Sequence, residues 1–265
     1  MTNHADEHDQ FARGRLLYGN EGIESLQKMR VAVFGLGGVG GYVAESLVRT
    51  GIGAIVLIDH DTVDTTNLNR QIIATHETIG MNKTDAMEQR LLSINPACCI
   101  TKHECFYLPE TADAFDLTEY DYVIDAVDTV TAKLELITRA TQVGTPIISA
   151  MGAGNKTDPT ALRIDDIYHT SVCPLARIMR KELRKRSIKN LTVCYSLEAP
   201  VSQESNPPQS NPAGKVSTAA KATATESISS RRSTPGSNAF VPSAMGLAMA
   251  AHVVNELIRE SQAKQ

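Results

Sequence analysis

A glycine-rich loop at residues 35–40 constrains the fold more than any other feature of this sequence. Its letters, GLGGVG, have the G-x-G-x-x-G spacing. A short β-branched and aromatic run at 31–34 precedes the loop, and a segment with helical apolar spacing at 42–49 follows it. Glycines in such a turn let the backbone approach a phosphate, and the free N–H groups at the start of a helix favour anions. The loop therefore predicts a nucleotide-binding βαβ unit. We predict that the nucleotide is bound by Gly35, Gly37, Gly38 and Gly40.

The alternation of strands and helices continues after this loop. A second apolar strand at 55–58 ends on Asp59, where a carboxylate can accept hydrogen bonds from ribose hydroxyls. Further strands are expected at 101–107, 122–125 and 146–150, and helices at 83–94 and 133–141. Strands that alternate with helices predict an α/β fold with a doubly wound, mostly parallel, Rossmann-like sheet.

The composition changes in the second half of the chain. Residues 202–235 are rich in Ser, Asn, Pro, Ala, Thr and Lys and hold few large apolar residues, which predicts a disordered loop. The expected division is a flexible tail at 1–10, a nucleotide-binding domain at 11–170, a basic helix and pocket segment at 171–201, the loop at 202–235 and a helical C-terminal part at 236–265.

The segment 240–258 is apolar and rich in small residues. Its uninterrupted apolar run is shorter than the ~20 residues that a membrane span needs, because polar residues such as His252 and Glu256 interrupt it. We therefore expect a buried packing helix and no stable membrane span, while peripheral contact with a membrane stays open.

Charge and cysteine content narrow the class of protein. The formal net charge of −4 creates no global positive field, so no DNA partner is expected, although a local basic patch can still bind nucleic acid. The five cysteines form no C-x-x-C pair, which argues against structural zinc. The odd cysteine count and the polar, acidic start, unlike a signal or transit peptide, predict a cytoplasmic protein.

The glycine loop alone does not separate NAD from ATP. A polar cluster directly follows Asp59, and it consists of Asp61, Asn67, Asn69, Arg70 and Gln71. Lys83 stands at the start of the next predicted helix. A triphosphate that passes through a pentavalent centre needs Arg and Lys more directly than a pyrophosphate does. Each cation taken singly could be a solvated surface charge, but together they favour ATP.

Several stretches of the first 155 residues resemble the superfamily of ubiquitin-activating enzymes, MoeB and ThiF. They are GLGGVGGYVAESLVRTGIGAIVLIDHDTVDTTNLNRQ, GMNKTDAMEQRLLSINP and DYVIDAVDT. The resemblance implies a ThiF-type fold and adenylation of a carboxylate by ATP. It implies these nucleotide-site residues: Asp59 on the ribose, Asn67, Arg70 and Lys83 on the phosphates, and Asp128 on Mg²⁺. We also assign Asp61 of the polar cluster to the nucleotide site. It also implies a homodimer, because Arg13 matches an arginine finger that reaches into the partner's site, with Arg15 as the fallback.

The second half resembles the tRNA threonylcarbamoyladenosine dehydratases. The matching stretches are AMGAGNKTDPTALRIDDIYHTSVCPLARIMRKELRK, YSLEAP and SNAFVPSAMGLAMA. These enzymes cyclise the threonylcarbamoyl group on the tRNA adenosine next to the anticodon. The resemblance implies a substrate pocket with Asn155, Lys156, Ser196 and Glu198. It also favours tRNA binding by the basic helix, through Arg177, Arg180, Lys181, Arg184, Lys185 and Lys189. Two departures are Cys173, where the family often has Asp, and the poorly matching 202–235 loop.

Three alternatives remain at this point. An activator of a small sulfur-carrier protein would share every nucleotide residue but usually carries zinc ligands. An NAD-dependent oxidoreductase would use the same glycine loop, and a non-catalytic binding module would keep the fold alone. The intramolecular nucleophile makes an enzyme thiol dispensable, so we expect Cys173 and Cys194 to be ordinary cysteines. A monovalent cation and a sulfur-transfer protein are further partners that the resemblance leaves open.

Overall fold

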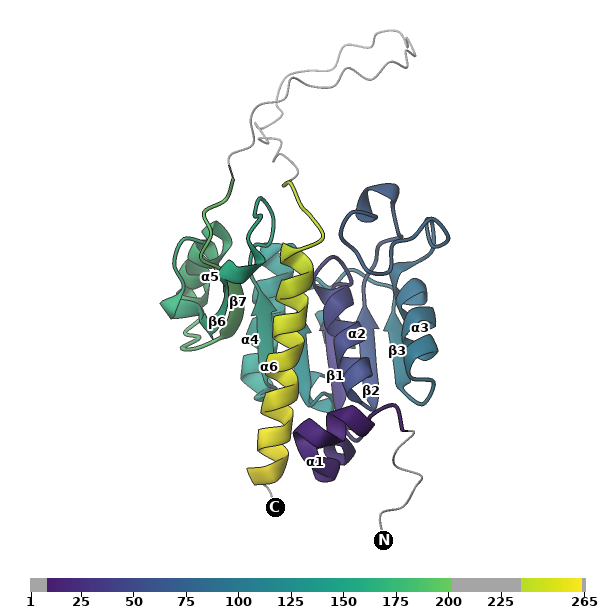
Figure 1. The fold of residues 1–265 in the computed structure, drawn as a ribbon. Helices are drawn as coiled ribbons and strands as arrows, with labels where there is room; N and C mark the ends of the chain where they lie inside the picture. The colour runs from purple at the N-terminus through teal and green to yellow at the C-terminus, as the bar shows by residue number, and fades with distance from the viewer. Residues whose placement is uncertain (1–8, 202–234, 264–265) are drawn as a thin grey trace, which may run out of the picture.

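The chain forms an α/β fold around one sheet, and this computed structural model describes residues 9–201 and 235–263 (Figure 1). The strands are β1 (Arg30–Phe34), β2 (Ala54–Ile58), β3 (Cys99–His103), β4 (Tyr122–Asp125), β5 (Ile147–Ala150), β6 (Leu162–Asp166) and β7 (Thr192–Ser196). The α-helices are α1 (Ala12–Leu26), α2 (Gly40–Thr50), α3 (Lys83–Ile94), α4 (Val130–Val143), α5 (Pro174–Lys185) and α6 (Val241–Ala263).

The seven strands of these described residues lie in the order β3-β2-β1-β4-β5-β7-β6. Every neighbouring pair is parallel except β6 and β7, which run antiparallel. This topology confirms the predicted doubly wound, mostly parallel sheet. Its chain reversal falls between β1 and β4, which is where open α/β sheets bind ligands.

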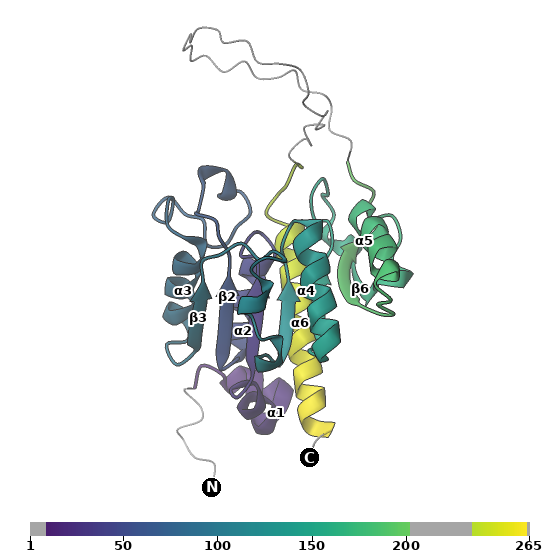
Figure 2. The same cartoon turned by 180° about the vertical axis from the view of Figure 1, so that it is seen from behind.

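Alternating side chains of the central strand explain why helices cover both faces. Val31 and Val33 of β1 join the core that includes side chains of α1, α2, α3 and α6. Ala32 and Phe34 of the same strand point the other way, into a core that α4 completes. Figures 1 and 2 show α6 and α2 over one face and α4 over the other. A strand buried on both faces needs apolar residues at every position, as this one has.

The register of the sheet brings the predicted nucleotide residues together. Phe34 pairs with Ile58 on one side and with Asp125 on the other, so three neighbouring strands end level with one another. The glycine loop, the segment from Asp59 and the segment from Ala126 therefore leave the sheet at the same edge.

The second half of the chain contributes to the same sheet. β7 pairs in parallel with β5, which places Val193 beside Ser149, and β6 adds an antiparallel edge strand. Neither strand was predicted from the sequence. The helix α6 packs closely on α2, since a Cβ added to Gly246 would lie 2.5 Å from the Val39 carbonyl oxygen. The predicted boundary at residue 170 stays a prediction, but the sheet runs across it.

The helix α6 is long and apolar enough to cross a membrane by length and composition, and among the described residues it is the one such helix. Within its most apolar stretch, 56% of the residues are buried inside the protein, which agrees with the predicted packing helix. The predicted disorder of 202–235 falls outside the described residues except at Pro235, and the predicted tail at 1–10 does so except at Asp9 and Gln10.

Candidate nucleotide and substrate site

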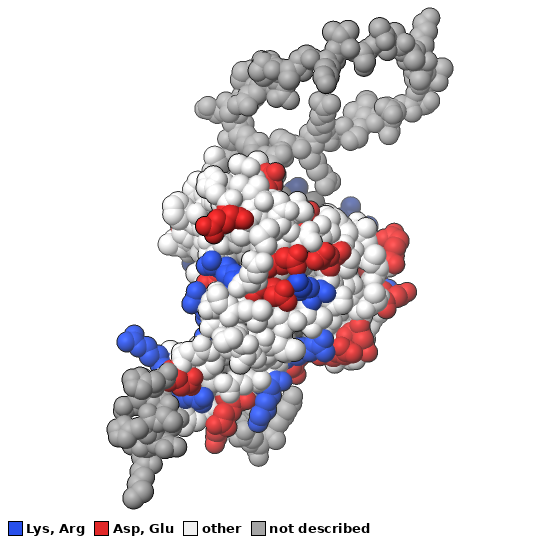
Figure 3. All heavy atoms as spheres, turned by 90° about the vertical axis from the view of Figure 1, so that its right-hand side faces the viewer, with Lys and Arg blue, Asp and Glu red and all other residues white. Residues whose placement is uncertain are grey.

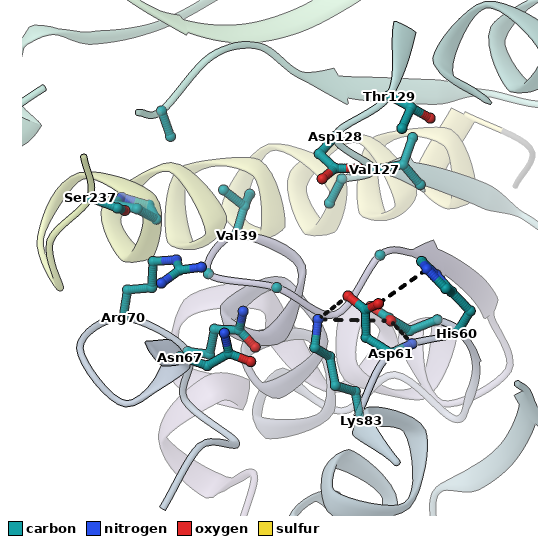
Figure 4. A pocket seen from close by; sticks show the side chains of 18 of the residues that line it. Val39, His60, Asp61, Asn67, Arg70, Lys83, Val127, Asp128, Thr129 and Ser237 are labelled. Atoms are coloured by element: carbon teal, nitrogen blue, oxygen red, sulfur yellow. Dashed lines mark hydrogen bonds and ion pairs between the residues drawn. The ribbon is translucent and has the colours of Figure 1, made fainter. Parts of the chain in front are cut away.

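A cavity of about 1050 Å³ opens at the carboxyl ends of the parallel strands (Figure 4). The structure brings together nearly all the predicted nucleotide residues on its wall. They are Gly35, Gly37, Gly38, Asp59, Asp61, Asn67, Arg70, Lys83 and Asp128. Figure 4 shows Arg70, Asn67 and Lys83 along one side, with Val127 and Asp128 facing them from the other. Gly40 is not on the wall, because it begins α2 behind the loop.

Two glycines of the loop are required by space and backbone conformation. Gly35 has a φ of 90°, and a Cβ there would lie 2.6 Å from the Ala126 carbonyl oxygen. A Cβ on Gly40 would lie 1.8 Å from the Gly35 carbonyl oxygen, so the loop closes on itself only without a side chain. Gly37 differs, because the nearest atom to its added Cβ is an amide nitrogen 3.9 Å away. Its lack of a side chain keeps the cavity wall open.

Asp59 ties the glycine loop to the end of β2. Its Oδ2 accepts a hydrogen bond from the Leu36 backbone N–H at 2.6 Å, and its Oδ1 accepts one from the Asp61 N–H at 2.9 Å. The side chain is nearly buried, with 9% of the residue exposed, and still lines the cavity. A carboxylate that is held by two backbone donors has a fixed orientation, and the predicted contact of Asp59 with ribose stays a prediction.

Lys83 is a nearly buried cation, 6% exposed, at the first turn of α3. Its Nζ donates to Asp61 at 2.6 Å and lies 3.9 Å from Asp59 (Figure 4). A buried ammonium needs such a partner, because an unpaired charge away from water is costly. Asp61 has the same sign of charge as a phosphate. Asp61 therefore holds Lys83 at the cavity wall, and the nucleotide contacts predicted for Lys83 and Asp61 stay predictions.

Arg70 projects from a short turn that its neighbours fix. Asp64 accepts a hydrogen bond from the Thr66 N–H at 2.8 Å, and Asn67 Oδ1 accepts one from the Asp64 N–H at 3.1 Å. Arg70 Nη1 then donates to the Thr66 carbonyl at 2.9 Å and to Asn69 Oδ1 at 3.0 Å. One end of the guanidinium is thus anchored, and its other N–H groups remain for phosphate oxygens.

Asp128, the predicted Mg²⁺ ligand, differs from Asp59 and Asp61 in that its carboxylate has no partner among the described residues and lies on the cavity wall. Asp59 and Asp61 already hold backbone N–H groups and Lys83. Within residues 9–201 and 235–263, Asp128 makes no hydrogen bond or ion pair, and it is exposed on the cavity wall. Carboxylate oxygens are the ligands that Mg²⁺ takes beside substrate phosphates.

An aromatic and apolar part of the wall was not predicted. The rings of His60 and Phe106 meet edge to face, with centroids 4.2 Å apart, and Val127 lies on the same wall. We expected a strand over 101–107, but β3 ends at His103, and Cys105, Phe106 and Tyr107 line the cavity instead. The sequence signal that could have found these wall residues was their position, because residues just after a parallel strand reach the ligand-binding edge of the sheet.

The four predicted substrate-pocket residues lie beside the cavity, and none of them is on its wall. Lys156 is 3% exposed and donates through Nζ to the Glu198 carbonyl. Backbone N–H groups of Asp158 and Thr157 hold the pKa of the Glu198 carboxyl below its usual value. Ser196 Oγ accepts a hydrogen bond from the Glu198 N–H at 3.1 Å. These hydrogen bonds connect the segment around Lys156 to the segment around Glu198. The contact of the four residues with substrate stays a prediction.

The basic helix α5 is amphipathic. Its apolar face, with Ala176, Met179 and Leu183, is buried. The predicted tRNA ligands exposed in or just after it are Arg177, Lys181, Arg184, Lys185 and Lys189. Arg180 is half-buried and donates to the Thr170 carbonyl at 2.9 Å, Lys185 pairs with Glu182 at 2.7 Å, and the Arg184 guanidinium lies 5.1 Å from the centre of the Tyr168 ring.

Arg13 lies away from the cavity of its own chain. It is exposed in the first turn of α1, a helix at the opposite end of the sheet from the start of α6 (Figure 1). Arg15, the fallback, forms an ion pair with Asp9 at 3.1 Å. Neither arginine lines the cavity, so a contribution from either residue has to come from a second copy of the chain.

The cysteines give no sign of a thiolate nucleophile. All five are free, and Cys173 and Cys194 are buried. Burial raises the pKa of the Cys194 thiol to about 12 and that of Cys98 to about 11. A thiol with so high a pKa is protonated at neutral pH and is a poor nucleophile.

This fold is that of a recognised class. A model described as the ThiF family matches residues 11–265, and the chain belongs to that family. It is similar to the tRNA threonylcarbamoyladenosine dehydratase of Bacillus subtilis (strain 168), with 41% identity over 259 residues, 97% of each chain. The solved structure of E. coli tRNA N6-threonylcarbamoyladenosine dehydratase, TcdA, in complex with ATP matches with a TM-score of 0.82 and 28% identity over 100% of both chains. The same enzyme in complex with AMP matches with a TM-score of 0.81 and 29% identity over 100% of this chain and 99% of the other.

Two glycine substitutions should separate folding from nucleotide binding. We expect Gly40→Ala to lower the free energy of unfolding by about 1–3 kcal/mol or more, because its Cβ meets backbone. Gly37→Ala should leave stability within about 0.5 kcal/mol, yet weaken ATP binding at least about tenfold, since its methyl group enters the cavity. Urea unfolding followed by circular dichroism and titration with a fluorescent ATP analogue measure the two effects. Equal ATP affinity of Gly37→Ala and wild type would contradict this account of the loop.

Proposed function

We propose that this chain is an ATP-dependent tRNA threonylcarbamoyladenosine dehydratase. The observation that carries the proposal is the similarity of nearly the whole chain to enzymes of that name, and the cavity that gathers the predicted nucleotide residues supports it. The reaction activates the threonine carboxylate of the modified adenosine and closes a ring. ATP is consumed, and the substrate loses one water.

The chemistry has two steps. A carboxylate oxygen attacks the α-phosphorus of ATP, the bond to pyrophosphate breaks, and an acyl-adenylate forms. A neighbouring atom of the carbamoyl group then attacks the activated carbonyl, loses its proton and expels AMP. The nucleophile belongs to the substrate, so the protein has to supply positioning and charge stabilisation. The buried, protonated Cys194 agrees with this division of labour.

The cavity residues divide these tasks among them. Asp59 orients the ribose, and Asn67, Arg70 and Lys83 bind phosphate oxygens whose charge is redistributed in the transition state. Asp128 would hold Mg²⁺, which when bound neutralises phosphate charge. The wall of His60, Phe106 and Val127 suits the flat, apolar faces of the adenine ring. We assign no described residue to a monovalent cation or to a sulfur-transfer protein.

A homodimer completes the site in this proposal. Arg13 stands next to two apolar side chains on α1, Leu16 and Leu17, which are 85% and 80% exposed. Side chains of this kind at the surface indicate a contact with another molecule. A two-fold dimer in which the cavity end of each copy covers these leucines of the other would bring the Arg13 of each copy to the cavity of its partner. The enzyme acts in the cytoplasm in this proposal, and peripheral membrane contact through α6 is not required.

The tRNA surface is placed on α5. This helix shares a hydrophobic core with β7, next to the edge of the sheet that β6 forms. The opposite edge, formed by β3 and α3, carries intermixed charges of both signs (Figure 3). There Lys102 is neutralised by Asp85 at 2.5 Å and by Glu88 at 2.7 Å. By contrast, Arg177, Lys181 and Lys189 form no ion pair within the described part of the chain, and this leaves them for phosphates.

The direct test is mass spectrometry of nucleosides from threonylcarbamoyl-modified tRNA treated with the protein and ATP. We expect the modified nucleoside to lose the mass of one water, with AMP and pyrophosphate as the other products. Arg70→Ala should slow this conversion about 10²–10³-fold, because it removes a donor aimed at the developing charge. A wild-type protein that binds ATP but leaves the nucleoside mass unchanged would refute the proposed function.

Mixed dimers test the arginine finger. Arg13→Ala and Arg70→Ala should each be nearly inactive as homodimers. In a mixed dimer, one of the two sites combines an intact Arg70 with the partner's intact Arg13. Random subunit exchange should therefore restore about one quarter of the wild-type activity. Activity that stays at the level of the single variants after proven exchange would show that Arg13 does not act across subunits.

Salt dependence tests the tRNA surface. The triple substitution Arg177→Ala, Lys181→Ala and Lys189→Ala should flatten the slope of log affinity for tRNA against log salt by roughly 2–3 units, because three phosphate contacts are lost. ATP affinity should stay unchanged. Lys102→Gln on the opposite edge is the matched control and should keep the wild-type slope. An unaltered slope in the triple variant would move the tRNA surface away from α5.

A further inference from the structure

Asn69 joins the phosphate-binding turn to a distant part of the chain. Its Oδ1 accepts a hydrogen bond from Arg70 Nη1 at 3.0 Å. Its Nδ2 donates to the Ser237 carbonyl at 3.0 Å, across 168 positions of sequence. Both polar atoms of the Asn69 side-chain amide therefore have a partner. The oxygen accepts from a group that can only donate, and the nitrogen donates to a group that can only accept. The opposite orientation would set two donors against each other at Arg70, so the contacts define a single arrangement.

The Ser237 end of this bridge belongs to a rim segment, residues 235–238, which runs into α6. Pro235, Gly236 and Ser237 line the cavity beside the turn that bears Arg70. Asn238 ends the segment, and its Oδ1 accepts hydrogen bonds from the N–H groups of Phe240 at 2.9 Å and Val241 at 3.0 Å. These contacts cap the start of α6 and fix one end of the rim segment to a packed helix.

The other end of the rim segment is fixed to the loop after β5. Gly236 donates its N–H to Asn155 Oδ1 at 2.6 Å, and the Asn155 N–H donates to the Gly236 carbonyl at 2.8 Å. Asn238 Nδ2 donates to the Lys156 carbonyl at 2.8 Å. Asn155 has a positive φ of 56°, a conformation that Asn tolerates better than most residues. The Ser237 carbonyl is thus a stationary acceptor.

We propose that Asn69 is a positioning residue for adenylation, which aims the Arg70 guanidinium at the phosphates by tying it to the rim segment. This inference rests on the proposed phosphate role of Arg70. A free arginine side chain carries about 2 kcal/mol of rotamer entropy. Here the Thr66 carbonyl at 2.9 Å and Asn69 Oδ1 hold one nitrogen of the guanidinium. Because Asn69 is itself held at Ser237, the second half of the chain sets the direction of an arginine in the first half.

The consequence is specific to phosphate. Asn69 lies on the cavity wall beside Arg70, and the contacts described for Asp59 and for the His60–Phe106 wall do not pass through it. Asn69→Ala should therefore loosen Arg70 and leave the binding of the nucleoside part unaltered. A misplacement of about 1 Å in a phosphate-binding group can cost on the order of 100-fold in rate.

Competition binding against a fluorescent ATP analogue tests this inference, with ATP and adenosine as competitors. We expect Asn69→Ala to weaken ATP binding about tenfold, which corresponds to about 1.4 kcal/mol, and to change adenosine binding less than about twofold. In an Arg70→Ala background, Asn69→Ala should add almost nothing, because residues that act through one another are not additive. Gln89→Ala, which removes an exposed amide on α3, is the control and should match wild type.

Two results would overturn the inference. Equal weakening of ATP and adenosine would show that Asn69 merely supports the fold, and additive losses in the double variant would show that it does not act through Arg70. The binding readout needs no tRNA. A wild-type protein that fails to dehydrate tRNA, but shows the expected binding cycle, would refute the proposed function and leave the role of Asn69 standing.

Discussion

A buried ion pair between Lys133 and Asp125 holds the cavity edge of the sheet together. Lys133 is 1% exposed and Asp125 is fully buried, and Nζ lies 3.1 Å from the carboxylate. Lys133 also donates to the Ala150 carbonyl at 2.8 Å, so it ties the end of β4 to the end of β5. Asp125 accepts the Val127 N–H at 3.3 Å, which orients the segment before Asp128. Either charge alone would be costly to bury, so the loops after β4 and β5 both depend on the ion pair.

The nucleotide cavity is built from both halves of the chain. The glycine loop supplies one wall, but Pro242 of α6 lies against it, 3.1 Å from the place of a Cβ on Gly38. The rim segment supplies a further wall through Ser237. In the chain, the helix α6 with Pro242 comes after a segment that begins with α5 and ends beside the Asn155 loop. The cavity is therefore lined by both halves of the chain, and hydrogen bonds of the rim segment connect it to the loop that holds Asn155 and Lys156.

The sequence was informative wherever a function follows from local order. Strand, glycine turn, helix and terminal acid predict their own placement, so their order in the sequence placed Asp59 beside the glycine loop, where the cavity opens. Contacts between distant segments leave no such signal, and the Asn69–Ser237 hydrogen bond spans 168 positions. The predicted end of β3 was wrong for a different reason. The apolar and aromatic residues up to Tyr107 suit a strand and the wall of a cavity equally well, and only the sheet register decides between them.

The charges of the cavity fit the proposed binding of a highly charged nucleotide. Lys83 is almost buried, yet its partner Asp61 has a side chain that is 48% exposed. An arriving phosphate can take the place of Asp61 at the ammonium, and the carboxylate can turn into water at little cost. Asp59 cannot leave in this way, since backbone donors at Leu36 and Asp61 hold it. Binding then becomes an exchange of partners at Lys83, in which no lone buried charge has to be created. In the proposed mode of binding, Asp59 stays in place for the ribose while Asp61 turns into water, and the two carboxylates behave differently because their burial differs.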